Sequence, residues 1–165
     1  MTVSIIKIGP EHTDAFASIW ITWLKNTIGR DPEPEDLEVM ADPAGYYAKS
    51  GGTALLAMDD GEIVGGVAVK GLGAAGFEFC KLVVTEAARR NGAGRALVEA
   101  CLHYAKEQGG PVLYLQSFNA LQVALGLYGR MGFVQTDAPP EMTVLARTEV
   151  VMAKALGSPP KMLMR

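Results

Sequence analysis

A glycine-containing stretch, residues 89–95, lies between an apolar segment and an amphipathic one, and it constrains the chain more than any other feature. Residues 77–84 form an apolar run typical of a buried strand, and helical periodicity begins near Gly94. Glycines at positions 92 and 94 let a ligand approach the main chain closely. The first N–H groups of a helix have no partner within it and attract anions. The stretch therefore predicts a cradle for a phosphate or pyrophosphate group.

Length and composition limit the number of domains and the classes of partner that the chain can have. The 165 residues, 49% of them hydrophobic, suffice for one sizeable core, so we expect one domain over residues 1–156 and a flexible tail at 157–165. The formal net charge of -3 argues against a nucleic-acid partner, because such proteins present a basic face. No signal-peptide pattern and no membrane-length apolar run is present, so we expect a cytoplasmic protein with no membrane partner.

Apolar periodicity predicts a mixed α/β fold in layers. An Asp60-Gly61 pair between two apolar runs is typical of a β-hairpin, and the strand at 77–84 is expected to pair antiparallel with its predecessor. Expected strands are residues 3–8, 53–58, 63–69, 77–84, 112–116 and 133–135, with a last strand within 143–156. Expected helices start near Pro10, span 34–41, surround Tyr46 and Tyr47, follow Gly94 and begin at Asn119.

Two common phosphate-binding motifs do not fit the glycine stretch. A dinucleotide-binding turn requires a third glycine, which is absent after Gly94, and it follows its strand at once, whereas seven residues separate Val84 from Gly92. The acidic residue expected about twenty positions further on is also missing. No GxxxxGK[ST] motif occurs, which excludes a Walker loop.

The motifs resemble those of the GNAT superfamily of acetyl-CoA-dependent N-acetyltransferases. Its [Arg/Gln]-x-x-Gly-x-[Gly/Ala] motif is matched by residues 89–94, and its Leu-Tyr-x-x-x-Gly-Phe element by residues 127–133. The strand from Glu78 to Val84 is similar to that of members that acetylate amino acids and other small molecules. Further similar pieces are Gly51-Gly52, residues 60–65 and residues 147–152, so the resemblance extends over residues 3–156.

The resemblance implies a three-layer fold with a central, mostly antiparallel mixed sheet of about seven strands, flanked by helices and splayed in a V between the fourth and fifth strands. It implies acetyl-CoA as cosubstrate and no metal. The main-chain N–H groups of residues 89–95 would hold the pyrophosphate: Arg89, Arg90, Asn91, Gly92, Ala93, Gly94 and Arg95. The main chain of Leu82, Val83 and Val84 would pair with the pantetheine arm, and the resemblance implies a bulge near these residues, which the sequence alone does not locate. An ordinary loop and core strand is the alternative.

Tyr128 is the candidate general acid, because the resemblance implies that its hydroxyl lies near the thioester sulfur. Ordinary pKa values of about 10 for tyrosine and about 8.5 for a thiol make complete proton transfer uphill by about 2 kcal/mol. A hydrogen bond to the developing thiolate, or a shifted tyrosine pKa, fits better than simple donation. The alternative is a core aromatic, since Tyr128 follows Leu121 by seven residues on an apolar helix face.

Glu78 is the candidate general base, acting directly or through water, because an alkyl ammonium with a pKa near 10 must lose a proton before it attacks. The resemblance implies that this residue opens the strand beside the thioester. The alternative is a solvated strand end.

The remaining polar and aromatic residues allow fewer assignments. Asn119, paired with Gln122, fits a helix N-cap, with cofactor contact as the alternative; the role of Lys81 stays open. Trp20 and Trp23 would line the acceptor cleft or the core, and Arg147 would suit an acceptor that carries a carboxylate. The two histidines and two cysteines have no metal-ligand spacing and are interpreted as structural: His12, His103, Cys80 and Cys101.

These inferences predict transfer of an acetyl group from acetyl-CoA to the primary amine of a small molecule, by direct attack in a ternary complex. Two alternatives stay open: a catalytically silent acyl-CoA-binding or sensor module, and an N-acetyltransferase that acts on proteins. Members of the family often dimerise, so a homodimer is one expected assembly, although the sequence does not determine the oligomeric state.

Overall fold

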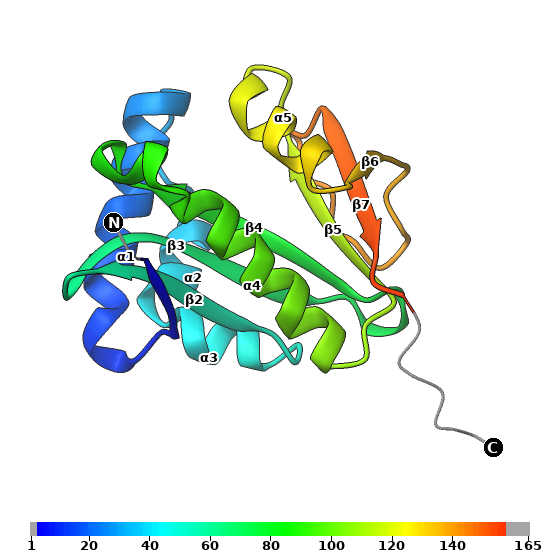
Figure 1. The fold of residues 1–165 in the computed structure, drawn as a ribbon, viewed down its shortest axis with the longest axis horizontal. Coiled ribbons are helices and arrows are strands. Elements are labelled where there is room, and N and C mark those ends of the chain that lie inside the picture. Colours follow the sequence, from blue (N-terminus) through cyan, green and yellow to red (C-terminus); the bar gives the residue numbers. More distant parts are fainter. Residues whose placement is uncertain (1–2, 158–165) are drawn as a thin grey trace.

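A seven-stranded sheet in the order β1-β2-β3-β4-β5-β7-β6 forms the centre of the computed structural model, which describes residues 3–157 (Figure 1). Neighbouring strands are antiparallel except β4 and β5, which are parallel. The strands are β1 (Ser4–Lys7), β2 (Thr53–Asp59), β3 (Glu62–Gly71), β4 (Phe77–Val84), β5 (Val112–Ser117), β6 (Val134–Gln135) and β7 (Val150–Ala155). The expected mixed, mostly antiparallel sheet is confirmed; most of the tail expected at 157–165 lies outside the described residues.

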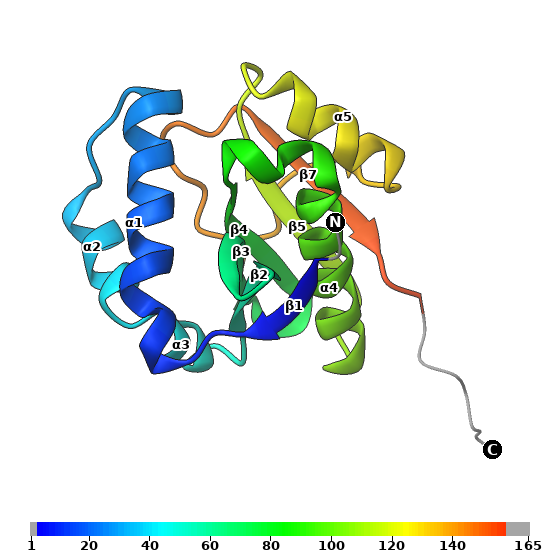
Figure 2. The ribbon, with the colours of Figure 1, turned by 60° about the vertical axis from the view of Figure 1, so that its left-hand side comes forward.

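Helices cover both faces of the sheet and produce three layers (Figure 2). One face carries α1 (Thr13–Trp23), α2 (Pro34–Ala41) and α3 (Pro43–Ala48), and the other carries α4 (Ala93–Glu107) and α5 (Gln122–Arg130). Within residues 3–157, no helix has the length and apolar character needed to cross a bilayer.

Local sequence signals explain most element boundaries. The β2–β3 turn places Asp60 at φ 51° and Gly61 at φ 82°, so the two central residues have the left-handed backbone of a tight hairpin, as predicted. At the start of α2, the Glu33 N–H donates to Asp36 Oδ2 at 3.0 Å. Helix α1 continues into a π-helical turn, Leu24–Ile28, which ends at Gly29, a glycine with a φ of 76°.

Each face of the sheet has its own hydrophobic core. Side chains of β2, β3, β4 and β5 alternate between the faces, so that Phe79 packs towards α4 and α5 while the adjacent Glu78 and Cys80 point towards α1–α3. On the α1–α3 side, Phe16 and Trp20 are almost completely buried. The sheet therefore separates two groups of buried aromatic side chains. Phe79 belongs to the group under α5, and Phe16 and Trp20 belong to α1 on the opposite face.

The strands β4 and β5 part soon after they meet. Within the described residues they share only two register pairs, Phe77 with Leu113 and Glu78 with Tyr114. Beyond Glu78, β4 stays paired with β3 but not with β5. The V-shaped splay expected between the fourth and fifth strands is thus confirmed.

A β-bulge at Lys81 and Leu82 accompanies this parting. Gly66 of β3 pairs with Val83 and Ala68 pairs with Cys80, so Val67 alone lies opposite two residues of β4. Lys81 has a φ of 59°, an unfavourable value for a residue with a side chain, and it directs this side chain to the α1–α3 face. The bulge overlaps the expected range of 82–84 but begins one residue earlier.

Gly66 allows α1 to pack closely on β3. A Cβ atom at this position would lie 2.6 Å from Phe16 Cε1. We expect Gly66→Ala to lower the free energy of unfolding by about 1–3 kcal/mol, because Phe16 is buried and would have to move. Gly129→Ala is the control: its Cβ would meet nothing within 4 Å, and alanine favours helix α5 by up to about 1 kcal/mol. Urea unfolding measures both, and equal effects would contradict this account of Gly66.

Candidate active site

The glycine stretch lies at the start of α4, beside the open end of the V. A short helical turn, Glu86–Asn91, leads into Gly92, which has a φ of 78°. The Ala96 N–H donates to the Gly92 carbonyl at 2.9 Å, so the helical ladder begins there and the N–H groups of residues 93–95 point out of the helix end. This is the geometry of an anion cradle.

The cradle borders both walls of the gap. A Cβ atom on Gly94 would lie 3.7 Å from Val84 Cγ2 of β4 and 4.0 Å from Leu127 Cδ2 of α5. Arg89, Arg90 and Asn91 are exposed on the preceding turn. The N-terminus of α4 is therefore aligned with the space between β4 and α5.

Within residues 3–157, the C-terminal half of β4 is paired with another strand along only one of its two edges. Val83 and Val84 pair with Gly66 and Gly65 of β3, whereas the opposite edge faces the gap. The side chain of Leu82 packs against the core under α4, and that of Val83 is buried on the other face. Their main-chain groups at the free edge can pair with an extended ligand, as an added strand would.

Tyr128 of α5 stands against β4 on the α4 and α5 side of the sheet. Its ring meets Phe79 edge-on with centroids 5.5 Å apart, and it is 6% exposed. Burial raises the pKa of its hydroxyl above the ordinary value. The hydroxyl therefore stays protonated and suits donation of a hydrogen bond better than release of its proton. The ring also belongs to the core, so both sequence interpretations of Tyr128 describe part of its environment.

Glu78 lies at the apex of the V, in the last register pair before β4 and β5 part. It is 5% exposed, and its Oε2 accepts a hydrogen bond from Gln116 Nε2 at 2.9 Å. Burial raises the pKa of its carboxyl group, partly opposed by the Gln116 hydrogen bond and by the charges of Lys70 and Lys81. The alternative of a solvated strand end is wrong, because the side chain points into the layer between the sheet and α1–α3.

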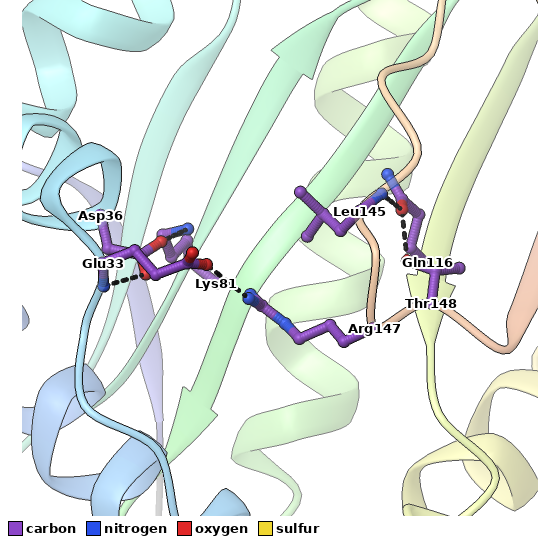
Figure 3. A network of polar contacts seen from close by, with 7 residues as sticks. All are labelled: Glu33, Asp36, Lys81, Gln116, Leu145, Arg147 and Thr148. Atoms are coloured by element: carbon purple, nitrogen blue, oxygen red, sulfur yellow. Dashed lines mark hydrogen bonds and ion pairs between the residues drawn. The ribbon is translucent and has the colours of Figure 1, made fainter.

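The bulge places Lys81 in a polar network on the same face (Figure 3). Its Nζ lies 3.3 Å from Asp36 Oδ1 of α2 and 4.5 Å from the ring centroid of Trp20. Trp20 is 2% exposed, whereas Trp23 is half-buried at the edge of the same core. Trp20 therefore serves mainly as core, and its ring also supports the Lys81 ammonium.

A segment before β7, residues 143–148, closes over this face. Arg147 Nη1 lies 3.6 Å from Glu33 Oε2, which links the segment to the start of α2 (Figure 3). A pocket of about 230 Å³ opens beside this pair and is lined by Leu24, Arg30, Asp31, Glu33, Asp36 and Arg147. The structure thus brings Arg147 to the face that also carries Glu78 and Lys81.

Gln116 of β5 is the residue that the sequence analysis missed. Its side chain contacts Glu78 and the segment at 143–148 together. A glutamine at an alternate position of an apolar strand is the signal that could have identified it, because an amide that is partly removed from water requires hydrogen-bond partners.

The predicted N-cap role of Asn119 is wrong. The N-cap of α5 is Leu121, and the backbone carbonyl of Asn119 accepts a hydrogen bond from the Gln122 side chain instead. The Asn119 N–H donates to Glu149 Oε1 at 2.9 Å, so this residue is held to the segment before β7 and outside the helix.

The cysteines and histidines have structural contacts within the described residues. Cys80 and Cys101 are free thiols whose burial raises their pKa, and Cys80 Sγ donates to the Tyr47 hydroxyl at 3.5 Å. His12 Nδ1 accepts from Gly9, and His103 lies 3.3 Å from Glu107. No group of three metal-ligating residues is found between residues 3 and 157.

Comparison with known proteins identifies one family for this sequence and fold. A model of the acetyltransferase (GNAT) family matches residues 16–133. No curated protein sequence matches the chain. Among solved structures, a GNAT-family acetyltransferase from Staphylococcus aureus Mu50 aligns with a TM-score of 0.86 at 21% identity, covering 94% of this chain and 100% of the other.

Two further structures differ in the acceptor that their names state. A phosphinothricin acetyltransferase from Sinorhizobium meliloti, in complex with acetyl-CoA, aligns with a TM-score of 0.76 at 17% identity, covering 95% of this chain and 90% of the other. The ribosomal-protein-S18-alanine N-acetyltransferase from Escherichia coli aligns with a TM-score of 0.72 at 16% identity, covering 99% and 100%. At these identities the similarity establishes the fold.

Proposed function

The chain belongs to the acetyltransferase (GNAT) family, and on this premise we propose that it transfers an acetyl group from acetyl-CoA to the primary amine of a small molecule. The amine attacks the thioester directly while both substrates are bound. The proposal includes one catalytic domain over residues 1–156; formation of a homodimer stays a prediction.

The parting of β4 and β5 at Glu78 is the observation that carries this proposal. It leaves a free strand edge at Leu82, Val83 and Val84, with an anion cradle at one end and a buried carboxylate at the other. An extended ligand with a diphosphate at one end and a reactive carbonyl at the other matches this order of groups.

The cradle fits a diphosphate in both space and charge. A Cβ atom on Gly92 would meet nothing within 4 Å, so the surface is open there, and the helix end supplies N–H donors. We assign the diphosphate of coenzyme A to the main chain of residues 89–95 and its pantetheine arm to the free edge of β4.

Glu78 of β4 and Tyr128 of α5, which lie on opposite faces of the sheet, have separate roles in the reaction. The thioester supplies the activated acetyl group. Glu78 accepts the proton of the acceptor ammonium, directly or through water, and its raised pKa brings it closer to that of the amine than an ordinary carboxyl group. Tyr128 donates a hydrogen bond to the sulfur as negative charge develops on it, because its own pKa is too high for easy proton release.

The acceptor would occupy the α1–α3 side of β4. The pocket near Arg147 is small and contains charges of both signs, which favours a compact acceptor over an extended peptide chain. Arg147 is the residue assigned to a carboxylate on the acceptor, since its only ion pair within residues 3–157 is the single 3.6 Å contact with the exposed Glu33.

Amine-dependent release of coenzyme A tests the proposed function. A panel of small amines, amino acids and peptides with free N-termini is incubated with acetyl-CoA and the enzyme, and free thiol is measured. Acceleration by small amines or amino acids supports the proposal, and acceleration by peptides alone favours the protein-acetylating alternative. Binding of acetyl-CoA without any amine-dependent release indicates the silent acyl-CoA-binding module.

Gly92→Ala should weaken binding of coenzyme A at least about tenfold, because its methyl group projects into the open space assigned to the diphosphate. Gly109→Ala, at the other end of α4, is the matched control: Gly109 also has a positive φ, of 80°, and a Cβ added there would meet nothing within 4 Å. Both substitutions should cost about 1 kcal/mol of stability through backbone strain. Titration calorimetry measures the affinities, and equal affinities for the two variants would argue against the assigned cradle.

Tyr128→Phe should lower kcat by about tenfold or more while leaving the affinity for coenzyme A within about twofold. The substitution keeps the ring that packs on Phe79 and removes only the hydroxyl. Tyr104→Phe is the control. Tyr104 lies near the C-terminal end of α4, away from the cradle, and its hydroxyl donates to the Gly51 carbonyl at 2.7 Å. A thiol-release assay gives both values of kcat, and an unchanged kcat in Tyr128→Phe would remove its proposed role.

Arg147→Ala should raise KM about tenfold or more for acceptors that carry a carboxylate and leave KM for neutral amines nearly unchanged. Glu33→Gln is the informative counterpart, because it frees Arg147 from its competing carboxylate and should lower KM for the same acceptors. Steady-state kinetics with paired acceptors, such as an amino acid and its amide, distinguish the two classes. A KM that is insensitive to Arg147→Ala contradicts carboxylate recognition.

A further inference from the structure

The carboxamide of Gln116 connects two strands and a loop through four hydrogen bonds. Its Nε2 donates to Glu78 Oε2 at 2.9 Å and to the Thr143 carbonyl at 2.9 Å. Its Oε1 accepts from the Leu145 N–H at 3.0 Å and from Thr148 Oγ1 at 2.6 Å. Both donors and both acceptor positions of the amide are therefore occupied.

Gln116 also occupies a special position in the sheet. It lies two residues after Tyr114, the last β5 residue paired with β4, and on the same face of β5. Main-chain pairing between the strands has ended at this point. The side chain of Gln116 therefore spans the beginning of the gap and reaches Glu78 across it.

The partners determine the orientation of the amide. The Thr143 carbonyl can only accept a hydrogen bond, and the Leu145 N–H can only donate one. A flipped amide would place two acceptors together at Thr143 and two donors together at Leu145. The segment at 143–148 thus holds the N–H group of Gln116 towards Glu78.

We propose that Gln116 is a positioning residue for catalysis: its side-chain N–H group holds Oε2 of Glu78, so that Oε1 of Glu78 is left to accept the proton of the acceptor amine. The bonds from Gln116 to residues 143–148 tie this orientation of Glu78 to the segment that carries Arg147. The inference rests on the proposed function, in which Glu78 is the base. Gln116 itself exchanges no proton; the ammonium N–H bond breaks and the new O–H bond forms on Glu78.

The surroundings of Glu78 make this contact the main directional interaction of its carboxylate. Lys70 of β3 and Lys81 of β4 contribute charge, and Cys80 of β4 and Tyr47 of α3 lie on the same side as neutral groups. Tyr114 is its register neighbour on β5. Among these residues only Gln116 forms a hydrogen bond with Glu78 in the described part of the chain, and this bond favours the charged form.

Gln116→Leu tests the inference, because it keeps the size of the side chain and removes the donor. The acid limb of kcat/KM, assigned to Glu78 by its loss in Glu78→Gln, should move up by about one pH unit or more. The carboxyl carbon of Glu78, followed by NMR with labelled glutamate, should titrate at a correspondingly higher pH. The measurement uses the full chain with acetyl-CoA and the best amine of the panel.

Two further variants separate positioning from a purely structural role. Thr148→Val removes one bond between Gln116 and the loop but keeps the bond to Glu78, so the acid limb should stay in place. Gln116→Glu keeps the acceptor for Leu145 and Thr148 and places a carboxylate against Glu78, so the limb should move up even further. Unchanged affinity for coenzyme A verifies that each variant is folded.

The possible outcomes are distinct. An upward shift in both the NMR titration and the kinetic limb supports the inference. An unmoved limb in active Gln116→Leu and Gln116→Glu variants overturns it and leaves the proposed function intact, as does an equal shift in Thr148→Val. Absence of amine-dependent release in the wild-type enzyme overturns the proposed function, and the inference with it.

Discussion

The early end of pairing between β4 and β5 is the constraint on which the other features of the site depend. The two strands keep two register pairs and then part, and the bulge at Lys81 and Leu82 accompanies this change of direction. The unpaired edge is long enough to accept an extended ligand, and it begins at a buried carboxylate. A continuous sheet with the same residues would satisfy these main-chain groups internally and leave no place for a substrate.

The two faces of β4 separate the two halves of the proposed chemistry. On the α4 and α5 face, aromatic packing against Phe79 holds Tyr128 and keeps its hydroxyl neutral. On the α1–α3 face, polar groups from distant segments meet around Glu78 and Lys81. Burial raises the pKa of the Glu78 carboxyl group, and the Gln116 hydrogen bond opposes this effect. In the proposed mechanism, the balance of these two interactions determines how readily the carboxylate accepts a proton.

Local patterns allowed much of the fold to be predicted from the sequence. The hairpin at Asp60-Gly61, the glycine stretch and the helix that follows it depend on residues close together in the chain, so their signals survive without tertiary information. The helix start at Asn119 was wrong for a non-local reason: Glu149 and the beginning of β7 hold this residue outside the helix. The burial of Glu78 was likewise not evident, because the layer that covers it comes from α1–α3.

The sequence by itself determined the order of elements, the position of the glycine stretch proposed as an anion cradle and the residues of the family motifs, since each depends on local backbone preference or on the type of side chain. Only the tertiary structure decided which polar groups meet. The ion pair of Lys81 with Asp36 joins residues 45 positions apart, and the bonds of Gln116 join residues 27 to 38 positions apart. Such contacts depend on strand register and on the direction that the bulge gives to Lys81, and neither leaves a periodic signal in the chain.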